Sequence, residues 1–116
     1  MIQVQLSTLT VHDLVRRVKP IYEQIREGFD TANVPILDVY KEIAISPETS
    51  KTLFEYFPVQ CEHFGSSDGF YSAVRTLNYF MTTYNYFMEN RIDFTNMSLR
   101  SEDILILHTF LLFKDV

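Results

Sequence analysis

The sequence contains a single cysteine, no tryptophan, three glycines and four prolines among its 116 residues. One cysteine, Cys61, can form neither an internal disulfide nor a thiolate cage around a metal, so the chain fits a reducing compartment. So few glycines and prolines exclude a linker or a low-complexity chain. The length and the 47% of apolar residues predict one folded, globular domain over residues 1–116, which the apolar spacing described below makes helical.

Basic side chains are also scarce, since ten Lys and Arg stand against fifteen Asp and Glu, a formal net charge of −5. Nucleic-acid binding uses Lys and Arg to displace phosphate counterions, so this balance argues against nucleic acid as a partner. The mostly apolar tract at residues 104–113 is too short to cross a bilayer, which requires about 20 apolar residues in a helix. The N-terminus lacks the basic and apolar regions of a signal peptide. We therefore expect a soluble, cytoplasmic protein that does not bind a membrane.

Motifs that carry chemistry are missing from the sequence. It has no phosphate-binding glycine-rich loop, no His-Glu-x-x-His pair and no calcium loop. The three histidines, His12, His63 and His108, are scattered and make a weak case for zinc. Cys61 and His63 could form a nucleophile and its base, but catalytic Cys and His are usually distant in sequence. A buried thiol beside a surface histidine is the favoured interpretation, and we expect no enzyme, no cofactor and no metal.

The first residues alternate between apolar and polar side chains. Ile2, Val4 and Leu6 recur with the period of two that is typical of a half-buried strand, which predicts a short β-strand at residues 2–6. A lone strand has to pair with another protomer or another protein. Together with the apolar tract at residues 104–113, the strand predicts a homo-oligomer, most simply a two-fold dimer.

After the strand, the sequence predicts a mainly α fold, a small bundle of about five helices. The first helix is expected to begin at Thr10 as N-cap, to kink at Pro20 and to stop at Gly28. An apolar stripe at residues 36–43 predicts a second, short helix.

Three further helices follow along the chain. Ser46 and Pro47 are typical of an N-cap and a first helical position, and Pro58 should end or bend that helix. The fourth and longest helix is expected over residues 68–90. In the final segment Ser98 or Ser101 is the expected N-cap. The tract at residues 104–113 has no clean period, so a buried helix is favoured but a strand stays open.

The fourth helix is apolar on more than one side, which predicts that it packs on more than one side, inside the bundle or against a partner. The aromatic residues off its main stripe are the candidates for contact with a partner. The alternative is that they belong to the core. The four candidates are Tyr79, Phe80, Tyr86 and Phe87.

Three features, spread over residues 2–94, carry a resemblance to a known family. They are the strand leading into Leu9-Thr10-Val11 and a helix with Leu14 and Pro20, the two short helices up to Cys61, and the late helix with Leu77-Asn78-Tyr79-Phe80 and Tyr84-Asn85-Tyr86-Phe87. Together they resemble the small tail assembly chaperones of tailed bacteriophages. The richness in Phe and Tyr and the tract at residues 104–113 depart from that pattern.

The resemblance implies a non-enzymatic protein that binds a long, helical tape-measure protein and keeps it soluble until the tail tube forms around it. The leading functional hypothesis is therefore a chaperone that takes apolar helical segments of a client by helix-in-groove packing. The alternative is a small acidic inhibitor or immunity-type protein that blocks the basic surface of an enzyme. Salt distinguishes them, because a charge-steered inhibitor should lose association rate as ionic strength rises.

Overall fold

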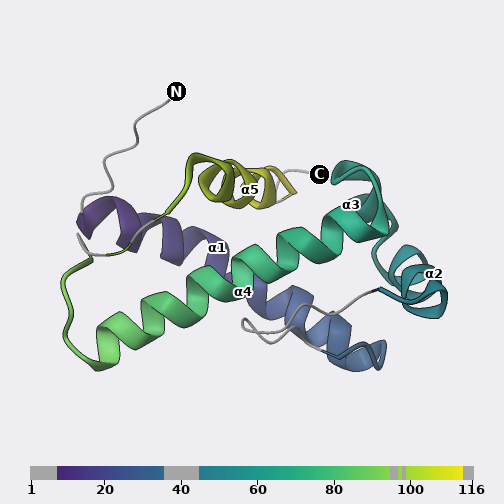
Figure 1. Cartoon of the computed structure of the whole chain (residues 1–116), viewed down its shortest axis with the longest axis horizontal. Coiled ribbons are helices and arrows are strands. Elements are labelled where there is room, and N and C mark those ends of the chain that lie inside the picture. Colours follow the sequence, from purple (N-terminus) through teal and green to yellow (C-terminus); the bar gives the residue numbers. More distant parts are fainter. Residues whose placement is uncertain (1–7, 36–44, 95–96, 98, 114–116) are drawn as a thin grey trace.

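The computed structural model in Figure 1 describes residues 8–35, 45–94, 97 and 99–113. Its five helices are α1 (Thr8–Thr31), α2 (Pro47–Tyr56), α3 (Pro58–His63), α4 (Ser67–Glu89) and α5 (Ser101–Leu112). The prediction of a mainly α fold is thereby confirmed. The strand predicted at residues 2–6 and the short helix predicted at residues 36–43 lie outside the described residues.

Helix α4 is the centre of the arrangement, because it contacts each of the other four helices. Figure 1 shows α4 running across the whole molecule, with α1 crossing behind it and α5 along one side of the pair. The short helices α2 and α3 lie at the end where α4 begins. The buried apolar side chains form one cluster to which all five helices contribute. The sequence prediction that α4 packs on more than one side is confirmed.

Helix α1 is longer at both ends than predicted. It begins at Thr8 rather than after Thr10, passes through Pro20, and continues beyond Gly28 to Thr31. Gly28 is therefore not a stop signal. A Cβ atom at this position would lie 2.5 Å from Cζ of Phe57, so the glycine allows the Phe57 ring to pack directly against the helix.

The start of α2 follows the sequence pattern closely. The Ser46 side chain accepts a hydrogen bond from the backbone N–H of Thr49 at 3.2 Å, and Pro47 is the first helical residue. Helix α2 ends at Tyr56 and Pro58 begins α3, as expected of a proline that cannot continue a preceding helix. The predicted start of this helix at Ser46 and Pro47 and its predicted end before Pro58 are both confirmed.

Helices α4 and α5 begin at different kinds of cap. Ser66 accepts a hydrogen bond from the Gly69 N–H at 3.0 Å, and α4 begins one residue before the predicted Asp68. The tract at residues 104–113 is helical, which decides between the two structures left open above. Its N-cap is Arg100, whose backbone N–H donates to Asp103. Of the two predicted caps, Ser101 is instead the first helical residue, and Ser98 lies outside the described residues.

Candidate functional site

The four aromatic candidates on α4 separate into two pairs. Tyr79 and Tyr86 are 45% and 56% exposed, whereas Phe80 is completely buried. Phe87 is partly buried and packs against the core, with its ring centroid 6.3 Å from that of Phe94. Residues seven apart on a helix lie on one side of it, so the two tyrosines face outward together and the two phenylalanines face inward together.

The outward surface of α4 between Arg75 and Glu89 carries no charged residue. Its exposed members include Tyr79, Thr82 and Tyr86, and we call these three residues the α4 face. An exposed helical surface normally carries charged side chains, so two large aromatic residues on an uncharged stretch are typical of a surface that contacts another macromolecule. The α4 face is therefore one candidate binding surface.

The histidines do not gather into a metal site. His12 is half-buried, with Nδ1 2.8 Å from the Tyr84 hydroxyl and its ring edge-on to Phe94 at 4.8 Å, so it ties α1 to α4. His63 lies on the surface with its ring 4.4 Å from that of Phe113. His108 is exposed on the side of α5 that faces away from the core. Over the described ranges, no group of three His, Cys, Asp or Glu side chains could hold a metal ion.

The structure does not bring Cys61 and His63 into a catalytic arrangement. Cys61 is completely buried, and its thiol donates a hydrogen bond to the Leu53 carbonyl at 3.5 Å. Burial raises the pKa of the Cys61 thiol, which disfavours the reactive thiolate. His63, in contrast, is exposed. The arrangement matches the interpretation of a buried thiol beside a surface histidine.

Cys61 is expected to react slowly with an alkylating reagent. Because the thiol is buried and its pKa is raised, modification of the native protein should be more than about tenfold slower than modification of the protein unfolded in denaturant. The rates can be followed by mass spectrometry with iodoacetamide at constant pH. Equal rates in the two states would show that the native thiol is accessible after all, and a faster rate in the native protein would return Cys61 to the list of catalytic candidates.

The apolar tract at residues 104–113 is divided between the inside and the outside of α5. Ile104, Leu107 and Phe110 are buried in the protomer itself, while Leu105 and Leu112 are exposed. The tract therefore packs largely onto its own core, and Leu105 and Leu112 are its most exposed apolar side chains for contact with a second copy. Self-association stays a prediction, and light scattering across a dilution series tests it.

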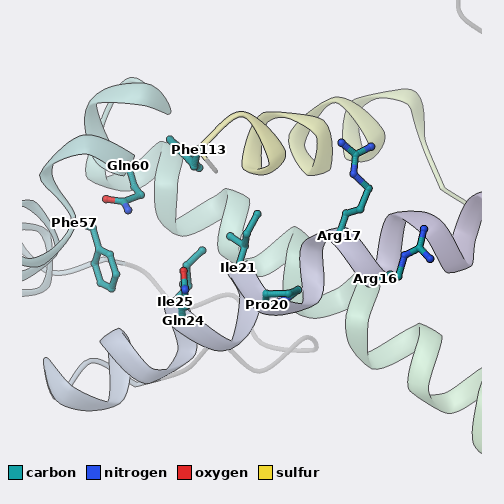
Figure 2. Close-up of a pocket in the computed structure, with 9 residues that line it drawn as sticks. All are labelled: Arg16, Arg17, Pro20, Ile21, Gln24, Ile25, Phe57, Gln60 and Phe113. Carbon is teal, nitrogen blue, oxygen red and sulfur yellow. The ribbon is translucent and has the colours of Figure 1, made fainter. Parts of the chain in front are cut away.

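A groove lies between α1, the junction of α2 and α3, and the end of α5 (Figure 2). Its volume is about 520 Å³, within the roughly 300–1,000 Å³ usual for ligand sites. We call it the α1 groove. The residues that line it are Arg16, Arg17, Pro20, Ile21, Gln24, Ile25, Phe57, Gln60 and Phe113.

The α1 groove has no clear signature in the sequence. The aromatic lining residues, Phe57 and Phe113, are far from α1 in sequence and reach it only through the fold. On α1 itself, several of the lining residues are polar and exposed, and such residues on a helix surface usually contact only water. The adjacent arginines Arg16 and Arg17 were the one local signal, and alone they are an ordinary exposed pair.

Over the described ranges, none of the helices is both long and apolar enough to cross a membrane. No protein-family model, no curated protein and no solved structure matches the chain, so its function has to be argued from the α4 face and the α1 groove themselves.

Proposed function

We propose that this protein is a non-enzymatic, chaperone-type protein that binds apolar helical segments of a client protein. The observation that carries the proposal is the α4 face, where Tyr79 and Tyr86 are exposed on a stretch without charge. Tyrosine is enriched at protein interfaces because its ring supplies apolar area while its hydroxyl remains hydrogen-bonded. An uncharged aromatic surface suits an apolar client better than a charged one.

The spacing of the tyrosines suits a helical client. Seven residues at 1.5 Å per residue place Tyr79 and Tyr86 about 10 Å apart along α4. A client helix packed alongside would meet them with apolar residues that also recur every two turns. The resemblance to phage tail assembly chaperones motivates the same kind of client, a long helical protein such as a tape-measure protein.

The second candidate function is an acidic inhibitor or immunity-type protein. The net charge of −5 favours it, because an acidic surface can block a basic one. The α4 face, however, offers no charge between Arg75 and Glu89 for such a contact. Titrations of a partner at low and high salt separate the two, since only a charge-steered complex should lose most of its association rate at high salt.

Replacing both exposed tyrosines, Tyr79→Ser with Tyr86→Ser, should weaken client binding at least about tenfold. Tyrosines that become buried when a partner binds are among the side chains that contribute most to an interface. The measurement is co-expression with a long coiled-coil client, followed by quantification of soluble and co-purified client. Tyr56→Ser is the matched control, since Tyr56 is 48% exposed but lies at the end of α2.

Two results would contradict the proposal. If the wild-type protein neither increases the amount of soluble client nor co-purifies with it, the chaperone function is removed. If the double variant retains the client as well as the Tyr56→Ser control does, the α4 face is not the contact surface.

A further inference from the structure

We infer that the α1 groove is a second docking site, which takes an amphipathic helical segment carrying carboxylates at one end and apolar side chains at the other. This inference deepens the proposed function and rests on it, since the segment would belong to a protein client. It names the charge of that client segment and the surface that recognises it.

The charge of the groove is opposite to that of the chain. Two arginines and two glutamines are the polar lining residues, and no carboxylate is among them, although the chain has fifteen Asp and Glu and only ten Lys and Arg. Arg16 is paired with Asp13 at 2.6 Å. Arg17 is exposed and forms no ion pair with any residue in the described part of the chain, so its guanidinium is available to a carboxylate from outside.

The groove is also polarised along its length. Figure 2 shows Arg16 and Arg17 at one end and Phe57 and Gln60 at the other, with Pro20, Ile21 and Ile25 on α1 between the two ends. A segment that fits both ends therefore has its carboxylates near the arginines and its apolar side chains near Phe57.

The dimensions favour a helix as the occupant. The α1 residues of the lining recur as adjacent pairs on three successive turns, at residues 16–17, 20–21 and 24–25. The groove therefore follows α1 for about 14 Å, more than two helical turns. Arg16, Arg17, Pro20 and Gln24 are all exposed along its rim, which leaves the groove open on one side. A second helix can lie in such an open channel and cover it, whereas a small amphiphile would remain largely in contact with water.

The two surfaces can be tested separately. The α1 groove contains no residue of α4, so a variant in the groove leaves Tyr79 and Tyr86 unchanged. Arg17→Glu reverses the unpaired charge in the groove. Lys19→Glu is its matched control, since Lys19 is an exposed cation on the same helix and does not line the groove.

The experiment uses the full-length protein and a fluorescent peptide of about 20 residues, long enough to form a helix in water. Its two Glu residues, one turn apart, precede leucines at helical spacing. A second peptide replaces both Glu with Lys. Fluorescence anisotropy should show that the acidic peptide binds at least about tenfold more tightly than the basic one. Arg17→Glu should weaken binding of the acidic peptide about tenfold, and Lys19→Glu should weaken it no more than about twofold. At about 0.5 M salt, the preference for the acidic peptide and the effect of Arg17→Glu should both become smaller.

Several outcomes would overturn the inference. Equal losses of affinity for Arg17→Glu and Lys19→Glu would mean that binding of the acidic peptide depends only on the overall charge of α1. Decanoate, a small amphiphile with one carboxylate, is tested beside the peptides. Binding of decanoate without binding of the acidic peptide would assign the groove to a small amphiphile. Absence of any peptide binding removes the groove as a docking site but leaves the tyrosine variant and its client assay untouched, so failure here is distinct from failure of the proposed function.

Discussion

Replacement of Phe80 with alanine is expected to lower the free energy of unfolding by about 3–5 kcal/mol, the usual cost of removing a buried phenylalanine ring. Phe80 is completely buried within the cluster of core side chains around α4. Its neighbour Tyr79 provides the matched control, because it is 45% exposed on the same helix. Tyr79→Ala should cost less than about 1 kcal/mol.

Urea unfolding followed by circular dichroism measures both values. The midpoint should fall strongly for Phe80→Ala and slightly for Tyr79→Ala, with the same denaturant slope if the transition remains two-state. Phe80→Leu retains more of the buried volume and should lose less than Phe80→Ala. Similar small losses for Phe80→Ala and Tyr79→Ala would place Phe80 outside the core and return it to the candidates for partner contact.

Gly69→Ala is expected to destabilise the protein by about 2–3 kcal/mol, although alanine is ordinarily favourable in a helix. Gly69 lies in the first turn of α4, where a Cβ atom would come 2.2 Å from the backbone carbonyl oxygen of Phe64. Relief of this overlap requires movement of the backbone rather than rotation of a side chain. The expected cost therefore exceeds the gain in helix propensity.

Thermal unfolding followed by calorimetry tests this expectation. A loss of this size should lower Tm by about 8–12 °C, since 1 kcal/mol corresponds to about 4 °C for a domain slightly longer than 100 residues. Ser72→Ala is the control, because Ser72 is exposed one turn further along α4 and its replacement should change stability by no more than about 0.5 kcal/mol. A Gly69→Ala variant as stable as wild type would show that the turn before α4 adjusts freely.

Much of the fold could be predicted from local sequence, because the interactions involved join residues close in the chain. Ser46 caps α2 by accepting the N–H of Thr49, three residues later. Pro58 separates α2 from α3 by the geometry of its own ring. Likewise, the apolar spacing over α4 predicts its length to within one residue at each end.

The tertiary structure corrected predictions that depended on distant partners. Gly28 is locally typical of a helix stop, yet α1 continues through it, and the ring of Phe57 occupies the space where a Cβ would be. Phe80 and Tyr79 are adjacent aromatic residues on one helix, and only the packing of the neighbouring helices decides that one is buried and the other exposed.

By itself, the sequence determined the mainly helical fold, the N-cap of α2 and the extent of α4, because these depend on periodicity and on contacts three or four residues apart. Only the tertiary structure decided which aromatic residues of α4 face outward. It also brought Phe57 and Phe113 beside the arginines of α1 to form the groove. A surface of this kind is assembled from residues far apart in the chain, and their proximity follows from how the helices pack rather than from any local pattern.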